Sequence, residues 1–330
     1  MRGSSGVTQR RWSRGSIGPA GGSSARRILA GAVVAALGML ASGCGRQYVL
    51  LHPVGPVGHS ELRLMLLAGG AMAVVILFVC VLLAIAAVRF RDRQGRRAPY
   101  VPDWHQSRIL ESIWFIIPVL IVAIIAVPTV RQTYALAQVP QARKPLVVDV
   151  TSLSWKWFFE YPSAHVATVN HLVLPVGKPV LFELTADSAM NTFWVPQLGG
   201  MEYTMPGEVL PLWLQADHTG VYWGHSSNFS GLQFEKMFFS VKVVSASGFS
   251  SWVRQTRRSD PALTAAAYRR LRAFGTTGTA TYSGYPSGSF PKVTHRFTLT
   301  GGQYVPAVRG YGQMQMGMAG SGGTMPAGRP

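Results

Sequence analysis

The stretch that decides the fold is LMLLAGGAMAVVILFVCVLLAIAAV, residues 64–88 of the 330-residue chain. Its 25 residues include no charged side chain. At a rise of about 1.5 Å per residue, a helix of this length exceeds the ~30 Å hydrocarbon thickness of a bilayer and crosses it with some tilt. A buried helix of a soluble protein rarely avoids charge over such a length. The stretch therefore predicts a transmembrane helix.

A second uncharged run, residues 112–130, lies between Glu111 and Arg131 and is also long enough for one membrane span. Pro118 and Pro128 lie inside it. Membrane helices tolerate proline where neighbouring groups satisfy the freed carbonyls. Together, the two runs predict a transmembrane helical hairpin.

The distribution of arginine orients this hairpin. The formal net charge is +18, and two clusters of six arginines stand out, one in the first 27 residues and one between the two apolar runs: Arg2, Arg10, Arg11, Arg14, Arg26 and Arg27, then Arg89, Arg91, Arg93, Arg96, Arg97 and Arg108. Arginine-rich loops stay in the cytoplasm. Residues 89–111 are therefore predicted to be cytoplasmic, with residues 44–63 and everything after residue 131 outside. No nucleic-acid-binding motif accompanies the charge, so nucleic acid is not an expected partner.

The N-terminus has the organisation of a secretory signal. Residues 1–27 are basic, residues 28–43 are apolar with many small side chains, and Cys44 follows. This pattern predicts a lipoprotein signal peptide over residues 1–43, with Cys44 as the lipidated first residue of the mature chain. The alternative is an unprocessed apolar anchor, because Ala41 stands where leucine is usual. Lipidation would place the mature N-terminus outside, in agreement with the arginine loop.

Residues 145–245 show the alternation of apolar and polar side chains that is typical of half-buried strands. Val180, Phe182 and Leu184 are predicted to face a core and Glu183 to face out. Residues 210–215 and 239–243 alternate in the same way, with turn sequences between the segments. The pattern predicts an antiparallel sandwich or barrel of roughly 100 residues.

The C-terminal part is predicted to begin with a helical segment and to end in a disordered tail. Asp260 is expected to cap a helix that begins at Pro261 and ends at Gly275. Residues 301–330 are rich in glycine and methionine and are predicted to be disordered. The methionines at 314, 316, 318 and 325 could bind Cu(I) through their thioethers, but a low-complexity tail is the favoured interpretation.

Four motifs follow one another along the chain: Leu110-Glu111 with Trp114 and Pro118, the aromatic stretch at residues 155–162, Val195-Pro196 with Leu198-Gly199, and residues 220–237. Over roughly residues 44–300, they resemble subunit II of the heme-copper oxidases. The resemblance implies a membrane protein with a two-helix transmembrane hairpin, an external all-β cupredoxin-like Greek-key sandwich at residues 145–245 and a C-terminal helical extension at residues 246–300. It also implies a partner, oxidase subunit I.

Members that receive electrons from cytochrome c bind a dinuclear copper centre, CuA, in this domain. The positions that match its ligands are occupied here by Asn191, Ser226, Asn228, Ser230, Phe234 and Met237. Thiolates and imidazoles hold such copper, and serine, asparagine and phenylalanine do not replace them. The resemblance therefore implies a domain without CuA that does not accept electrons from cytochrome c. His218 and His225 lie nearby without a partner at ligand spacing and are predicted to be solvated loop histidines.

A subunit II without copper resembles the quinol oxidase branch of the family, as do residues 50–55, 249–253 and 290–297. This branch implies a complex that oxidises quinol, reduces O2 to water and translocates protons. Its hemes and CuB belong to subunit I, subunits III and IV are further partners, and this chain carries no cofactor. The implied location is the bacterial inner membrane, with the β domain in the periplasm. Two alternatives remain, namely a CuA-bearing cytochrome c oxidase subunit and a free-standing periplasmic copper-carrier lipoprotein.

Glu111 is the ionisable residue with a candidate mechanistic role. It lies at the predicted cytoplasmic end of the second helix, where the family has a carboxylate at the mouth of a proton channel into subunit I. Carboxylates at such boundaries often relay protons. The alternative is a glutamate that stabilises the N-terminus of the helix, where negative charge is favoured.

Overall fold

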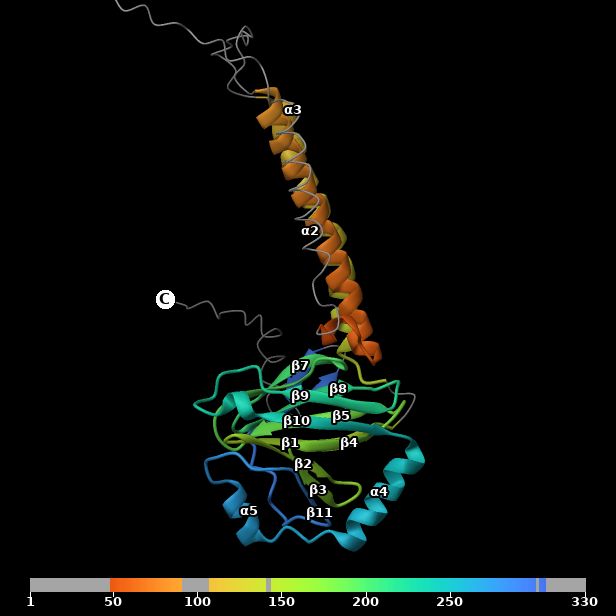
Figure 1. Ribbon diagram of the computed structural model, residues 1–330, viewed down its shortest axis with the longest axis vertical. Helices are drawn as coiled ribbons and strands as arrows, with labels where there is room; N and C mark the ends of the chain where they lie inside the picture. Colours follow the sequence, from red (N-terminus) through yellow and green to blue (C-terminus); the bar gives the residue numbers. More distant parts are fainter. Residues whose placement is uncertain (1–47, 91–106, 141–143, 301–302, 307–330) are drawn as a thin grey trace, which may run out of the picture. The chain divides into compact units, whose positions relative to one another are not determined.

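The computed structural model describes residues 48–90, 107–140, 144–300 and 303–306. A short 3-10 helix, η1 (Val49–Leu51), precedes two long helices, α2 (Pro56–Arg89) and α3 (Arg108–Leu136). A β domain of two sheets follows, and then two shorter helices and the last strands (Figure 1). The helical hairpin and the β-sandwich predicted from the sequence are confirmed.

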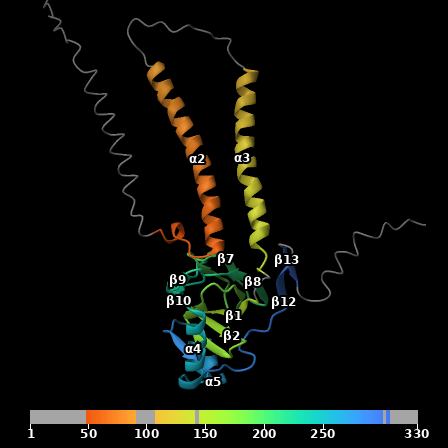
Figure 2. The ribbon, with the colours of Figure 1, turned by 90° about the vertical axis from the view of Figure 1, so that its right-hand side faces the viewer.

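The two long helices extend beyond the uncharged runs at both ends. Ser107 caps α3, because its Oγ accepts a hydrogen bond from the Leu110 amide at 3.4 Å. The helix then continues through Pro118 and Pro128. In the described residues, both helices are long and apolar enough to cross a membrane, and the most apolar window of each is not buried in the protein (Figure 2). Their side chains need lipid or a partner protein around them.

The β domain consists of two sheets of unequal size. The larger has the order β11-β3-β2-β1-β5-β8-β12-β13, with β1 (Leu146–Leu153), β2 (Lys156–Tyr161), β3 (Val166–Val169), β5 (Val180–Ala186), β8 (Glu208–Leu214), β11 (Ala280–Tyr282), β12 (His295–Thr300) and β13 (Gln303–Pro306). The smaller has the order β4-β10-β9-β6-β7, with β4 (His171–Pro175), β6 (Asn191–Val195), β7 (Gly199–Thr204), β9 (Gly220–His225) and β10 (Phe238–Val244).

The sandwich is not wholly antiparallel, which corrects the prediction from the sequence. β1 pairs with β5, β4 with β10, and β8 with β12, each in parallel. Parallel neighbours need a long crossover between them, and here β2, β3 and β4 lie between β1 and β5 along the chain. Local alternation reveals each strand but not this distant pairing.

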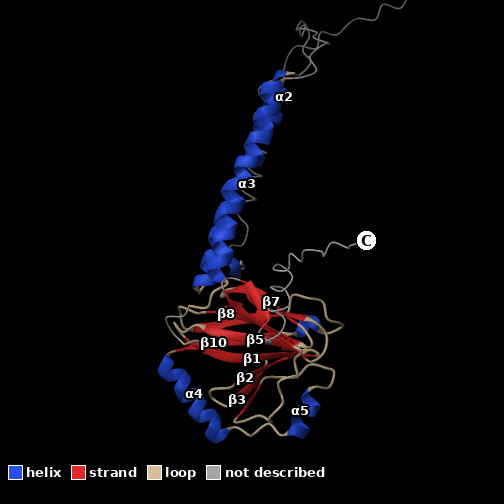
Figure 3. Ribbon diagram, turned by 180° about the vertical axis from the view of Figure 1, so that it is seen from behind, coloured by secondary structure: helices blue, strands red, loops and turns tan. Residues whose placement is uncertain are grey.

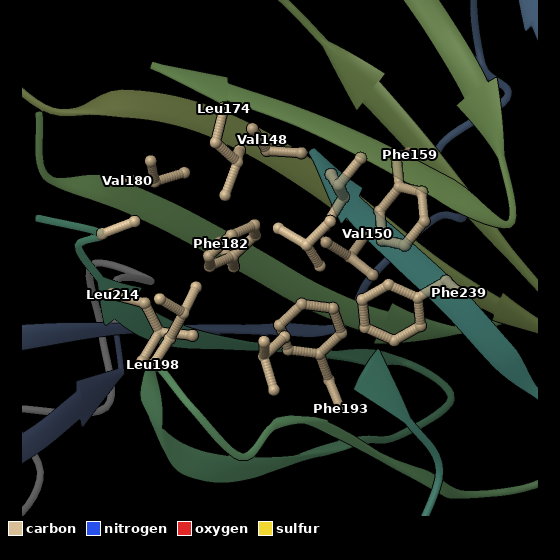
Figure 4. Packing of buried hydrophobic residues seen from close by; sticks show 14 of the residues in the cluster. Val148, Val150, Phe159, Leu174, Val180, Phe182, Phe193, Leu198, Leu214 and Phe239 are labelled. Carbon is tan, nitrogen blue, oxygen red and sulfur yellow. The ribbon is translucent and has the colours of Figure 1, made fainter. Parts of the chain in front are cut away.

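The core lies between the two sheets and is rich in aromatic rings (Figure 4). Phe182 from β5, Phe193 from β6 and Phe239 from β10 meet there, with ring centroids 5.0 Å apart for Phe182 and Phe193 and 5.1 Å apart for Phe193 and Phe239. Val180 and Leu184 are buried beside Phe182, as predicted, whereas Glu183 faces the other side of the sheet.

Residues 210–215 depart from the predicted alternation, because Trp213 is buried as well as Leu210 and Leu214. The Trp213 indole N–H donates to the carbonyl of Leu136, the last residue of α3, at 2.5 Å. The end of the helix therefore covers the face of β8 that the alternation assigns to solvent.

The C-terminal extension contains strands as well as helices, which corrects the purely helical prediction. Helix α4 (Ala246–Ser259) is followed by Asp260, whose amide donates to the Thr256 carbonyl at 3.0 Å. Asp260 therefore caps the C-terminus of α4 and not, as predicted, the N-terminus of the next helix. Helix α5 (Ala265–Leu271) begins later than predicted, with Thr264 as its cap (Figure 3). Within the tail predicted to be disordered, β13 pairs with β12, because paired backbone groups stabilise even a polar segment.

This extension covers the outer face of the larger sheet and forms a second apolar cluster. Phe158 from β2 packs against Tyr268 of α5, with ring centroids 5.4 Å apart. The buried Lys156 ammonium donates to the carbonyls of Leu271 and Ala273 at 2.9 and 2.7 Å. A lysine at this position neutralises the carbonyl end of α5, so it fixes that helix to β2.

Candidate functional site

The candidate site is the loop between β9 and β10, which lies beside the start of β6. The amide of Ser226, just after β9, donates to the carbonyl of Met237, just before β10, at 3.2 Å. Asn191, the first residue of β6, is fully buried next to the loop, and its Oδ1 accepts a hydrogen bond from Ser226 Oγ at 3.4 Å. The fold therefore brings residues 35 positions apart in the chain into contact.

The other three positions of the implied copper pattern lie on the same loop. Ser230 Oγ is 4.0 Å from the sulfur of the buried Met237. The Asn228 carbonyl accepts from Ser226 Oγ at 3.4 Å, while its side-chain amide donates to the Met190 carbonyl at 3.1 Å. The Phe234 carbonyl accepts from the Met237 amide at 3.0 Å.

These side chains do not fit a dinuclear copper centre. Copper held by cupredoxin folds needs thiolate and imidazole ligands, and the loop offers hydroxyls, amides, a phenyl ring and one thioether. The side-chain amide of Asn191 is already engaged in hydrogen bonds within the protein, because its Nδ2 donates to Ser152 Oγ at 3.3 Å and to the Ala189 carbonyl at 3.1 Å. Among the described residues, no three His, Cys, Asp or Glu side chains are placed to share a metal ion.

Two tryptophans, Trp155 in the turn before β2 and Trp157 in β2, hold this loop in place. Trp155 Nε1 donates to the Ser230 carbonyl at 3.0 Å, and the fully buried Trp157 Nε1 donates to the Met237 carbonyl at 3.2 Å. Both carbonyls belong to positions of the copper pattern. The sequence identified the aromatic stretch at residues 155–162 as a motif, but not that these two N–H groups satisfy the loop backbone.

The smaller sheet has an exposed apolar outer face. The strand register places Trp194 opposite Met201 and His225, and His225 opposite Phe238, so these four side chains form a row across β7, β6, β9 and β10. Met201 and Phe238 are about half exposed, and Trp223 on β9 is 61% exposed. We call the five residues Met201, Trp194, His225, Phe238 and Trp223 the outer apolar face. The alternation of side chains along these strands could have predicted the outer apolar face, but this face was not identified from the sequence.

The two histidines near the loop have different surroundings. His218 is exposed, as predicted. His225 is not surrounded by solvent, which corrects the prediction for this residue, because its ring lies 5.1 Å from that of Trp194 and 5.8 Å from that of Phe238. The last residue of β9 faces its neighbours across the sheet, so His225 belongs to the outer apolar face.

Glu111 lies in the first turn of α3, where its amide donates to the Ser107 carbonyl at 2.9 Å and the residue is partly buried. This position is compatible with both interpretations of the residue, a proton relay and a stabiliser of the helix N-terminus. Cys44 and the arginines at 91, 93, 96 and 97 lie outside the described residues.

Family comparisons cover both parts of the chain. The model of the cytochrome c oxidase subunit II transmembrane domain matches residues 64–131, and that of the cytochrome c oxidase subunit II periplasmic domain matches residues 158–244. Among solved structures, the periplasmic domain of subunit II of cytochrome oxidase (CoxB) from Bradyrhizobium japonicum is 24% identical, with a TM-score of 0.35, over 37% of this chain and 98% of that one.

Individual relatives match over a longer part of the chain. Quinol oxidase subunit 2 of a Bacillus cereus strain is 39% identical over 246 residues, which are 74% of this chain and 84% of the relative. Quinol oxidase subunit 2 of Bacillus subtilis strain 168 is 42% identical over 233 residues, which are 69% of this chain and 72% of the relative. Identity at this level over most of the relatives' length, with both domain models matched, shows that the chain belongs to the quinol oxidase subunit 2 family.

Proposed function

We propose that this chain is the subunit II of a bacterial membrane complex that oxidises quinol, reduces O2 to water and translocates protons. The observation that carries the proposal is the set of copper positions, Asn191 in β6 and the loop at residues 226–237, where five of six side chains are unable to act as copper ligands. The relatives of this chain are named quinol oxidase subunit 2. The chain would carry no redox centre, and the hemes and CuB would belong to subunit I.

The role of this chain in such a complex is structural. The exposed apolar side chains of α2 and α3 would be buried against lipid and subunit I. The outer apolar face of the β domain would contact the external surface of a partner subunit, since apolar and aromatic side chains gathered on one face are typical of protein interfaces. Subunits III and IV would complete the complex.

The outer apolar face gives the first test. Phe238→Asp should greatly reduce the amount of heme that co-purifies with a tagged chain, because the substitution places a carboxylate in a desolvated interface. The matched control is Phe274→Asp, since Phe274 is 82% exposed on the C-terminal extension and is not one of the residues of the outer apolar face. That variant should retain the heme.

Two results would contradict the proposed function, and a third would contradict the assignment of the outer apolar face as the docking surface. One is a wild-type chain that purifies alone with bound copper, as a copper carrier would. Another is a complex that contains CuA and oxidises cytochrome c. The third is an equal amount of heme with Phe238→Asp and with Phe274→Asp, which would leave the family assignment intact and show that the partner docks elsewhere.

Glu111 would supply protons to subunit I from the cytoplasmic side. Glu111→Ala should then slow oxygen consumption by roughly 100-fold or more, because general acid–base groups contribute effects of that order, whereas Glu111→Asp should preserve part of the rate. Turnover of the purified complex with quinol measures both. If oxygen consumption and proton pumping were unchanged in Glu111→Ala, the glutamate would only stabilise the start of α3.

The chain would lie in the bacterial inner membrane with its β domain in the periplasm. Cys44 would carry a lipid that adds to the two spanning helices. Mass spectrometry of the mature chain tests this processing: an acylated N-terminal Cys44 supports it, and an intact leader over residues 1–43 contradicts it.

A further inference from the structure

Three carboxylates form a row on the outer face of the larger sheet. Asp149 on β1 lies directly opposite Glu160 on β2 and directly opposite Glu183 on β5. Side chains in such positions have Cβ atoms about 4.5–5.5 Å apart, and like charges there repel each other. The inward neighbours Val148 and Val150 belong to the core, so the strand alternation turns all three carboxylates to the same outer face.

The C-terminal extension covers this row. Glu160 is only 1% exposed, and its Oε1 accepts a hydrogen bond from the Ser289 hydroxyl. The Arg296 guanidinium forms an ion pair with Glu183, whose side chain is 22% exposed. Ser289 lies in the segment between β11 and β12, and Arg296 is the second residue of β12. The segment is therefore attached to the sheet through the carboxylates themselves.

The charges of this cluster do not balance if all three carboxylates are ionised. Arg296 is the cation that faces the row from the extension, and it pairs with Glu183 rather than with the other two. Among the described residues, Asp149 Oδ1 and Glu160 Oε2 are buried and have no hydrogen-bond partner. A buried, unpaired carboxylate is costly, and it commonly takes up a proton instead.

The surroundings of the two carboxyls favour the protonated form. Burial raises the pKa of Asp149 to about 7. The charge of Glu183 and a hydrogen bond with its side chain raise the pKa further, while Arg296 opposes the shift. Burial also raises the pKa of Glu160 to about 7, with the Ser289 hydrogen bond opposing the shift and the charge of Asp149 adding to it.

Two phenols and their neighbours complete the ionisable surroundings. Burial raises the pKa of Tyr285 to about 12, and the charges of Glu160 and Asp149 add to the shift. Burial likewise raises the pKa of Tyr268, which also senses Glu160 and the Asp187–Arg272 ion pair. The His165 ring lies 4.7 Å from that of Tyr285. The phenols therefore stay neutral near pH 7 and do not titrate together with Asp149 and Glu160.

We propose that Asp149 and Glu160 together form a proton-binding site that fastens residues 283–296 of the C-terminal extension to the sheet when a proton is bound and loosens them when it is released. The inference goes beyond the proposed function, because it requires neither quinol nor a partner subunit.

The sign of the effect follows from the two states of the segment. When it is detached, the carboxyls face water and their pKa values return to about 3.9 and 4.3. The attached state therefore binds more protons between about pH 4 and pH 7. Attachment weakens as the pH rises through this range and levels off above about pH 7, once the attached state has also lost its proton.

Hydrogen–deuterium exchange of the full chain in detergent tests the proposal. After correction for the intrinsic pH dependence of exchange, the amides of residues 283–296 should exchange on the order of 30-fold faster at pH 7 than at pH 5, the effect of one proton with these pKa values. The double variant Asp149→Asn/Glu160→Gln should lose this dependence and stay protected at both pH values, since neutral amides replace the protonated acids. The control Glu235→Gln, at an exposed carboxylate, should behave like the wild type.

Two results would overturn the proposal: equal protection of the wild-type segment at pH 5 and pH 7, or wild-type pH dependence in the folded double variant. A second measurement applies even if that variant does not fold. Infrared spectra of the wild-type full chain should contain the C=O band of a protonated carboxyl that disappears near neutral pH and is altered in the single variant Glu160→Gln. If every carboxyl band of the wild type titrated near pH 4, the site would bind no proton at neutral pH.

Discussion

A chain with the substitutions Asn191→His, Ser226→Cys, Asn228→Glu, Ser230→Cys and Phe234→His should gain about two copper ions and visible colour on exposure to Cu(II). The unmodified chain should remain colourless and free of copper. The expectation rests on geometry, because the contacts among these positions are already present in the loop that Ser226 and Met237 close. Cysteines at positions 226 and 230 would bridge two metals, and thiolate coordination produces strong visible absorption.

The cost of these substitutions should be a loss of stability. Asn191→His removes the amide donor to the Ser152 hydroxyl and the Ala189 carbonyl. The Ser152 hydroxyl keeps its hydrogen bond with Thr204, so the cost is about 1–3 kcal/mol if the Ala189 carbonyl is left without a donor. Phe234→His alters a ring that now packs edge-on against Phe229, with centroids 5.0 Å apart. Bound copper should restore part of this loss, because a ligand that binds the folded state stabilises it.

The matched control is the same variant without Ser226→Cys, which has one thiolate and should neither hold two copper ions nor show the same colour. Metal analysis and absorption spectra measure both. If the complete variant folds but binds no copper, the loop does not present these positions toward one point, and the assignment of Asn191 and Ser226 to the copper pattern is wrong.

The helices were the most predictable part of this molecule. A run of 25 residues without charge, such as residues 64–88, has few stable environments other than lipid. The strand containing Val180, Phe182 and Leu184 was equally clear, because burial on one face repeats every second residue. The burial of Trp213 could not be predicted from the alternation of β8, because Leu136, which accepts its indole hydrogen bond and covers it, is 77 positions away in the chain.

The candidate site was predictable in its residues but not in its contacts. The resemblance to subunit II of the heme-copper oxidases was enough to locate Asn191, Ser226 and Met237, since its ordered motifs match Val195-Pro196 and residues 220–237. The row formed by Asp149, Glu160 and Glu183 was not foreseen, because it depends on strand register. Register between β1 and β5 is a property of the whole sheet, and no local pattern encodes it.

Trp157→Ala should destabilise the β domain by about 3–5 kcal/mol, the usual cost of removing a large aromatic side chain from a core. Trp157 is fully buried, and its ring centroid lies 5.6 Å from that of Phe193 and 5.5 Å from that of Phe239, both in edge-to-face geometry. These contacts join three strands from the two sheets, so the cavity left by alanine cannot close without moving both sheets.

Trp157→Phe separates packing from hydrogen bonding. It keeps an aromatic ring in the core but removes the indole N–H that donates to the Met237 carbonyl at 3.2 Å. The expected loss is smaller, about 1–3 kcal/mol, because a buried carbonyl is left without this donor. Trp155→Phe is the matched control, since Trp155 is only partly buried and donates to the Ser230 carbonyl of the same loop.

Urea unfolding of the three variants, followed by near-ultraviolet circular dichroism, gives the free energies of unfolding. In the copper-binding chain, Trp157→Phe should also weaken copper binding, because Met237 lies at the end of the loop that this N–H holds. If Trp157→Ala and Trp155→Phe lowered the free energy of unfolding by the same amount, Trp157 would not join the core to the loop. The loop would then keep its shape through Ser226 and Met237 alone.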